Sequence, residues 1–167
     1  MAIVKPFRGL RPPQDSAEEV ACLPYDVMNT EEAREMAEGN ERSMLHITRA
    51  EIDLPKGADV HSQEVYDRSR ENFKAFQEKG WLQQEEKPKF YIYAQTMNNK
   101  TQYGIVGAAA VDDYLNGIIK KHELTRPEKE EDRMKIIRVN NADLEPVFFT
   151  YPAVREIDEV VNQVVNS

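Results

Sequence analysis

The segment KKHELTRPEKEEDR, residues 120–133, combines residue types that bind phosphate with the start of a helix. Pro127 suits the first turn of a helix, where its missing N–H costs no hydrogen bond. Thr125 and Glu128 have the spacing of a capping box, in which each side chain bonds the backbone of the other. The free N–H groups of such a helix start attract anions. The pattern therefore predicts a helix over 126–140 with an anion-binding start.

Basic side chains surround this predicted helix start. Arg126, Lys129 and Arg133 recur at spacings of three and four and so share one helix face. Lys121 and His122 approach from the segment GIIKKHE, which we expect to be a short strand. Together these residues predict a phosphate-binding corner. The alternative is a solvated charged surface, since most charge runs in proteins are exposed faces.

A second corner lies in LPYDVMNTEE, where Asp26 follows an apolar run and precedes a helix expected to begin at Asn29 or Thr30. A carboxylate in such a position can act as a general base or bind a metal. Alternatively, Asp26 only shapes the turn. The sequence MLHIT places His46 among apolar neighbours, where it is either a hydrogen-bonded core residue or a side chain facing a cleft.

Composition narrows the class of protein. The 167 residues suffice for one domain with a core, and the net charge is 22 − 30 = −8. This acidity argues against a broad footprint on DNA or RNA, which needs clustered lysine and arginine. No apolar run approaches the roughly 20 residues of a transmembrane helix, and the N-terminus lacks the pattern of a secretory signal. A single cysteine excludes an internal disulfide. We expect a cytoplasmic protein, and the sequence leaves its oligomeric state open.

The order of elements predicts an α+β fold, with a mixed sheet, a β-hairpin and flanking helices over residues 1–167. KPKFYIYAQTM and TQYGIVGAAAVDD flank the turn NNK and predict the hairpin, in which Gly104 and Gly107 indicate a bulge or close packing. IVKPF, SMLHIT and PVFFTY are further expected strands. VREIDEVVNQVV is an expected helix, and a longer one ends at Lys79. The apolar face of that longer helix contains Val65, Tyr66, Ser69, Phe73 and Phe76.

Several stretches in order along the chain resemble one known family. They are KPFRGLRP, LPYDVMNTEEARE, SMLHITRAEIDLP, FYIYAQTM, GIVGAAAVDDYLNGIIKKHELTRPEKEEDR and PVFFTY, spread over residues 5–151. The chain resembles domain of unknown function 1015, a family related to the free serine kinases, with a ParB/sulfiredoxin-like fold. Members are usually much longer, so we expect this chain to be the N-terminal part of such a protein.

The resemblance implies a function. The related kinases phosphorylate free L-serine with ATP or ADP and magnesium, so a nucleotide and a small hydroxyl substrate are the expected ligands. By their positions, Lys121, His122, Thr125, Arg126 and Arg133 would bind the nucleotide. Asp26, His122 and Glu123 would be catalytic, with Asp26 as the base where the kinases have a glutamate. The alternative is a ParB-like nucleotide-binding switch or interaction module without kinase activity. The sequence assigns no metal ligands.

Overall fold

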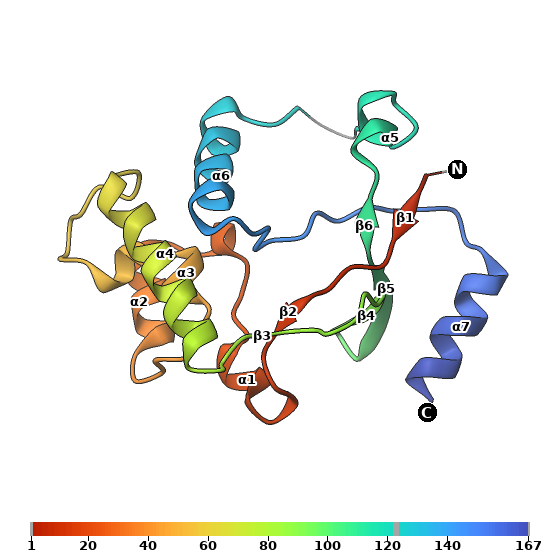
Figure 1. Ribbon diagram of the computed structural model, residues 1–167, viewed down its shortest axis with the longest axis horizontal. Helices are drawn as coiled ribbons and strands as arrows, with labels where there is room; N and C mark the ends of the chain where they lie inside the picture. Colours follow the sequence, from red (N-terminus) through yellow and green to blue (C-terminus); the bar gives the residue numbers. More distant parts are fainter. Residues whose placement is uncertain (1, 122–123, 167) are drawn as a thin grey trace. The chain divides into compact units, whose positions relative to one another are not determined.

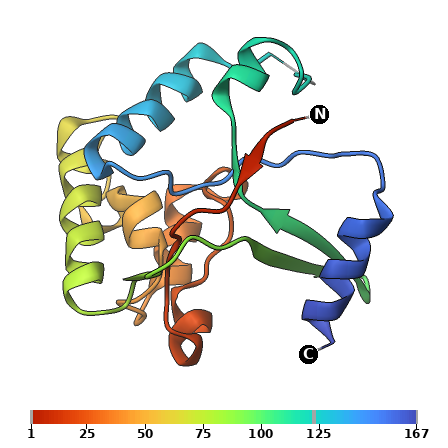
Figure 2. The same ribbon diagram turned by 45° about the vertical axis from the view of Figure 1, so that its right-hand side comes forward.

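The computed structural model describes residues 2–121 and 124–166 (Figure 1). The chain divides into two compact units. We call residues 10–84 with 123–146 the core unit, and residues 1–9, 85–122 and 147–167 the hairpin unit. A second view of the same elements is given in Figure 2. Both helices and strands are present, so the predicted α+β class, with a hairpin and flanking helices, is confirmed. The described strands form three antiparallel pairs, where the sequence predicted one mixed sheet.

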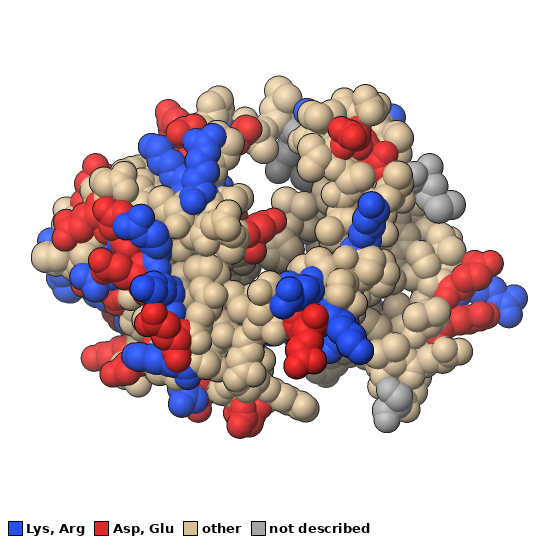
Figure 3. All heavy atoms as spheres, in the orientation of Figure 1, with Lys and Arg blue, Asp and Glu red and all other residues tan. Residues whose placement is uncertain are grey.

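The core unit is built on α4 (Gln63–Glu78), the longest helix that the structure describes. The apolar face predicted for this helix is confirmed, since all five of its residues are buried. The opposite face is charged. Lysine and arginine alternate there with aspartate and glutamate in ion pairs along the helix, as the left side of Figure 3 shows. Gly80, at φ +72°, follows the helix in the left-handed conformation that glycine adopts most easily.

Three short elements pack against α4 and its neighbours. They are α2 (Thr30–Ala37), α3 (Leu45–Thr48) and the 3-10 helix η3 (Ala50–Asp53). The Asn29 side chain accepts bonds from the N–H groups of Glu31 and Glu32, and the Glu32 carboxylate accepts one from the Asn29 N–H. This capping box fixes the start of α2. Ala33, Leu45 and Ile52 then form a buried cluster among these elements.

A buried polar relay joins three helices of the core unit. In α6 (Pro127–Asn140), Asn140 donates its side-chain N–H to Ser69 Oγ of α4, at 3.0 Å. Ser69 Oγ in turn donates to the carbonyl of Ile47 in α3, at 2.8 Å. Such bonds keep buried polar groups paired and fix how the helices pack. The unit also contains β2 (Leu10–Arg11) paired with β3 (Gln83–Gln84), α1 (Ala17–Val20), and the 3-10 helices η1 (Gln14–Ser16) and η2 (Tyr25–Val27).

The hairpin unit contains the predicted β-hairpin, which is confirmed. Strands β4 (Tyr91–Met97) and β5 (Lys100–Val106) pair antiparallel over their whole length. Asn98 and Asn99 form the turn with φ of 51° and 60°. Two positive φ angles define a type I′ turn, whose twist matches that of the paired strands. The remaining elements are β1 (Val4–Lys5) paired with β6 (Ala108–Ala109), α5 (Val111–Leu115) and α7 (Arg155–Val165).

The N-terminal segment is held within the hairpin unit by backbone pairing and by Asp113. The buried Asp113 carboxylate accepts a hydrogen bond from the N–H of Ile3, at 2.6 Å. At Gly107 an added Cβ would lie 2.7 Å from Val4 Cγ1, so close packing requires glycine there. At Gly104 a Cβ would meet nothing within 4 Å. The expectation of close packing is therefore confirmed for Gly107 and wrong for Gly104.

Three predicted strands do not form in the residues that the structure describes. The last four residues of SMLHIT form the helix α3, because so short a segment with only three apolar residues fits the helical period as well as the strand period. The described part of GIIKKHE, residues 117–121, contains no strand, and neither does PVFFTY. In PVFFTY, Val147 and Phe148 are both exposed, so apolar character there reflects no buried sheet. Within the described ranges, none of the helices has the length and apolar character that a membrane span requires.

Candidate functional site

Arg133 of α6 is held on three sides. Its Nη2 and Nε donate to Asp132 Oδ2 at 2.5 and 3.1 Å, and its Nη1 donates to Glu145 Oε2 at 3.3 Å. The guanidinium carbon lies 3.9 Å from the ring centroid of Tyr25, which is cation–π distance. The guanidinium is thereby fixed in orientation, with a weaker bond on the Glu145 side.

Asp26 belongs to the same group of side chains. It follows Tyr25 in η2, is exposed, and lies close enough for its charge to help raise the pKa values of Tyr25 and Glu145. The element η2 is itself anchored, because Arg49 Nη1 donates to the Tyr25 carbonyl at 3.2 Å. We call Tyr25, Asp26, Asp132, Arg133 and Glu145 the Arg133 cluster. It joins two residues that the sequence had assigned to different corners.

The two carboxylates that hold Arg133 have pKa values shifted in opposite directions. Burial raises the pKa of Glu145, and the guanidinium offsets only part of this effect. Burial also acts to raise the pKa of Asp132, but hydrogen bonds from Arg133 and Tyr66 outweigh it and the pKa is lowered. Tyr66 Oη donates to Asp132 Oδ1 at 2.7 Å, and His61 Nδ1 lies 3.1 Å from the same oxygen. Of these two carboxylates, Asp132 therefore keeps its charge more firmly, and Glu145 loses its charge more readily.

The other predicted site residues either lie outside the Arg133 cluster or are not among the residues that the structure describes. Thr125 and Arg126 are exposed, and Thr125 Oγ1 donates to Glu130 at 2.8 Å. The predicted capping box is wrong, because α6 begins after Arg126 and no side chain caps it. Lys121 lies in the hairpin unit, with Nζ 4.7 Å from the ring centroid of Tyr114. His122 and Glu123 lie outside the described residues.

Sequence reasoning missed three members of the Arg133 cluster. Tyr25 and Asp132 each adjoin a residue that was singled out, so their neighbours Asp26 and Arg133 were the available signal. Glu145 lies in a loop after α6 with no motif around it. Only the folding of that loop back toward α6 brings its carboxylate to the guanidinium.

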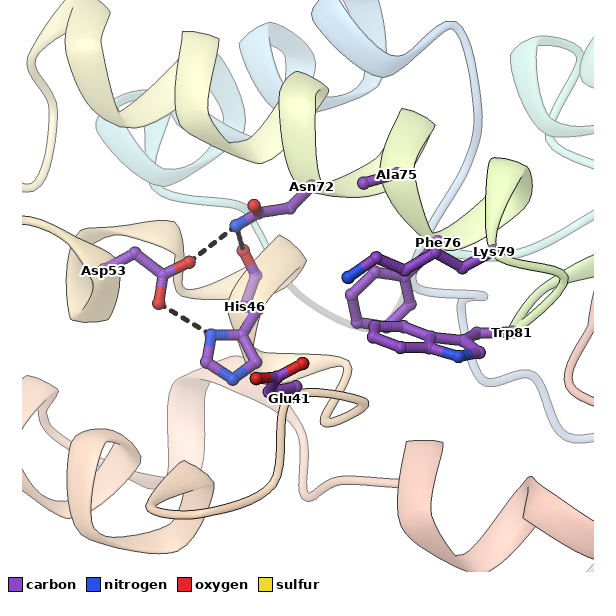
Figure 4. Close-up of a pocket in the computed structure, with 8 residues that line it drawn as sticks. All are labelled: Glu41, His46, Asp53, Asn72, Ala75, Phe76, Lys79 and Trp81. Atoms are coloured by element: carbon purple, nitrogen blue, oxygen red, sulfur yellow. Dashed lines mark hydrogen bonds and ion pairs between the residues drawn. The ribbon is translucent and has the colours of Figure 1, made fainter.

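His46 lies in a different part of the core unit (Figure 4). Its Nδ1 is 2.7 Å from Asp53 Oδ1, and its Nε2 is 3.1 Å from the carbonyl oxygen of Asn40. Asn72 donates to the other oxygen of Asp53, at 2.7 Å. These side chains border a cavity of about 330 Å³ that Phe76, Lys79 and Trp81 also line.

The partners of His46 decide its role. A carboxylate and a carbonyl are both acceptors, so both contacts are satisfied as hydrogen bonds only when each ring nitrogen carries a proton and the ring is a cation. The hydrogen bond with Asp53 accordingly raises the pKa of His46. Such an imidazolium has no lone pair with which to accept a proton from a substrate. We therefore interpret His46 and Asp53 as a structural ion pair, in agreement with the hydrogen-bonded core histidine that the sequence allowed.

Comparison with known proteins gives the family. The profile of one family, described as a protein of unknown function (DUF1015), matches residues 4–167. The chain belongs to the DUF1015 family. Searches of the curated proteins and of the solved structures gave no match. In this DUF1015 chain, α6, η2 and the loop after α6 supply the Arg133 cluster. No group of three or more metal-binding side chains is present among residues 2–121 and 124–166.

Proposed function

We propose that this DUF1015 chain is a nucleotide-dependent kinase that phosphorylates a small hydroxyl substrate such as free L-serine. The observation that carries the proposal is that Arg133 and Asp26 belong to one cluster around Tyr25. Phosphoryl transfer needs a group that stabilises phosphate charge beside a group that orients the attacking hydroxyl. The resemblance to the free serine kinases supplies the substrate class and the nucleotide, ATP or ADP.

Arg133 is the proposed phosphate anchor. A guanidinium matches two phosphate oxygens at once, and this one is already oriented by Asp132 and the Tyr25 ring. Glu145 holds the remaining side by its longer bond of 3.3 Å, and burial raises its pKa. A phosphate would therefore replace Glu145 at Nη1 and leave the Asp132 contacts in place. Thr125 and Arg126, in the same unit, would contribute from the start of α6.

The charges of the cluster fit a phosphate bound together with a divalent cation. One guanidinium pairs with the carboxylates of Asp132 and Glu145, and Asp26 adds a further negative charge near Tyr25 and Glu145, so a phosphate alone would enter a site with excess negative charge. Magnesium is usually bound by one or two carboxylates, with phosphate oxygens and water completing its shell. Glu145, once displaced from Arg133, is the carboxylate that would hold it. When bound, the ion would neutralise charge on the phosphates.

Asp26 is the proposed base. Its carboxylate is exposed at the rim of the cluster, where a hydroxyl substrate can reach it. It would accept the hydroxyl proton as the oxygen attacks the terminal phosphorus, and the nucleotide would leave with one phosphate fewer. The shorter side chain, relative to a glutamate, places this carboxylate closer to its own backbone, so the substrate hydroxyl would have to approach η2 more closely to reach it.

Phosphorus NMR of the protein with magnesium, L-serine and either ATP or ADP tests the proposal. We expect a new phosphomonoester signal, reduced about 100-fold or more by Arg133→Ala and by Asp26→Asn. Arg133→Lys is the second variant, because it keeps the charge near Asp132 and Glu145 while removing the planar fork. Arg138→Ala is the matched control, since it removes an exposed arginine from the same helix.

The results of this experiment distinguish the kinase from the ParB-like module. Product that is lost in the Arg133 variants and kept in Arg138→Ala supports the kinase. Nucleotide binding that depends on Arg133, without any phosphorylated product, would replace the kinase by the ParB-like switch or interaction module. Product formation unaffected by Arg133→Ala and Asp26→Asn would overturn the assigned site, and absence of both binding and product would overturn both functions.

A further inference from the structure

The hairpin unit has no buried hydrophobic core in the part of the chain that the structure describes. All buried hydrophobic side chains among the described residues belong to the core unit. In the hairpin, by contrast, Tyr93 is 58% and Met97 71% exposed, and Tyr103 and Ile105 are also exposed. A two-stranded hairpin alone is marginally stable in water. Apart from the edge-to-face contact of Tyr91 with Phe7, the described side chains of strands β4 and β5 therefore lack the buried packing that normally supports such a pair.

Both outer edges of the hairpin are open. Among the described strands, β4 pairs only with β5, and β5 only with β4. Because the two-residue turn makes Met97 and Lys100 a hydrogen-bonded pair, every second residue from there exchanges bonds across the ladder. The backbone N–H and C=O groups of Ile92, Ala94 and Thr96 consequently point away from β5. They form an edge that another strand can bind.

The β4 edge lacks the features that usually prevent such pairing. Natural edge strands carry lysine, other charges or proline, or are very short. The sequence of β4, YIYAQTM, has no charged residue and no proline over its seven residues. Over residues 90–111 the only charged side chain is Lys100, in a chain of which 31% of residues are charged. Strand β4 is thus uncharged, and the hairpin carries one charged side chain, in an acidic protein.

We propose that the β4 edge pairs with the β4 edge of a second copy of this chain, so that two hairpins form one four-stranded sheet. The antiparallel register centres on Ala94, which would face Ala94 of the other copy, while Ile92 would face Thr96. All three residues present outward backbone groups, so each of these pairs would exchange two hydrogen bonds. An isologous contact of this kind closes as a dimer.

The distribution of charge in the chain favours a second copy as the partner that binds the β4 edge. Two chains with a net charge of −8 repel each other over most of their surfaces. Self-pairing of β4 brings them together through a segment where no like charges meet across the seam. Seven residues at about 3.4 Å each give an edge roughly 24 Å long. The exposed side chains of Tyr93 and Met97 would then gain neighbours on the faces of the larger sheet.

Sedimentation velocity of the full chain over a wide range of protein concentration tests this dimer. We expect a monomer–dimer equilibrium in the unmodified protein and a monomer for Ala94→Pro, which removes an outward N–H without breaking the hairpin ladder. Ala94→Lys should also be monomeric, because it places two ammonium groups opposite each other at the centre of the seam. Gln102→Lys is the matched control, since it adds the same charge on β5 and should still dimerise.

The results decide between occupants. Circular dichroism of each variant establishes that the chain has folded. A monomer for the unmodified protein at every concentration would overturn the second copy as the occupant and leave the edge to an extended peptide of another protein. A dimer that persists in both Ala94→Pro and Ala94→Lys would show that another surface is responsible and would also overturn the proposal.

Discussion

His46 is held between Asp53 and the Asn40 carbonyl, and both contacts favour its charged form. Its pKa in the folded protein is therefore raised above the value of about 6.5 that histidine has in an unfolded chain. A group with a raised folded pKa stabilises the protein fully below its unfolded pKa, and this contribution is lost as pH rises through the folded pKa. The pKa of Asp53 is lowered, so its carboxylate remains ionised in mildly acidic solution.

We predict that His46→Gln destabilises the protein by about 1 kcal/mol at about pH 5.5 and by much less at about pH 9. Urea unfolding of both proteins at the two pH values measures the difference. His61→Gln is the control, because His61 is exposed and reaches Asp132 with one ring nitrogen only. A destabilisation that grows with pH would contradict the ion pair.

Individual residues also show how much of the candidate site could be predicted from the sequence. Asp26 and Arg133 were identified by their types and by nearby helix starts. Their association was not predictable, because it depends on stacking of Arg133 on Tyr25, more than a hundred residues away along the chain. The same holds for Glu145, which local sequence does not mark at all. Pairings across long sequence separations are set by tertiary packing, which no short motif encodes.

Two helix starts with similar sequence signals behave differently. Both Asn29-Thr30-Glu31-Glu32 and Thr125-Arg126-Pro127-Glu128 carry capping residues at the correct spacing. The structure forms the reciprocal bonds only at Asn29. In α6 the Thr125 hydroxyl is bonded to Glu130, and the first helical residue is Pro127. A capping sequence thus permits a cap, while the exact residue at which the helix begins decides whether it forms.

We predict that Asn29→Ala lowers the free energy of unfolding by about 1 kcal/mol, because two N–H groups of α2 lose their acceptor. Thr125→Ala should change it by less than about 0.5 kcal/mol, as is usual for exposed residues. Chemical denaturation of the two variants gives both numbers. Equal losses in the two variants would mean that α6 is capped by Thr125 after all.

For helices and strands, the spacing of the hydrophobic residues and the length of the segment decided which elements could be predicted from the sequence. The long helix α4 was found together with its complete buried face, because sixteen residues sample the helical period several times. The hairpin was found because its turn residues and the β-branched residues of its two strands both favour this structure. SMLHIT was misjudged as a strand, since its burial comes from neighbouring helices on several sides rather than from one sheet face.

The two units of the molecule differ in what stabilises them. The core unit buries Val20, Ile47, Phe73, Phe76 and Leu82 in one cluster beside the Ser69 relay. The hairpin unit is held by ladder hydrogen bonds and by the Asp113 contact with Ile3, without buried hydrophobic side chains among its described residues. Burial of apolar surface is the main stabilising term in folding, so the core unit should resist local opening far more strongly.

Amide hydrogen exchange at low protein concentration should therefore show slow exchange across α4 and fast exchange in β4 and β5. At high protein concentration we expect exchange to slow at only one edge of the hairpin. The N–H groups of Ile92, Ala94 and Thr96 should gain protection, because they would donate to the second copy, whereas those of Thr101 and Tyr103 on the outer β5 edge should not. Residue-resolved exchange by NMR distinguishes the two edges. Protection that rises equally on both edges would mean that the hairpin only folds more firmly, without the proposed seam.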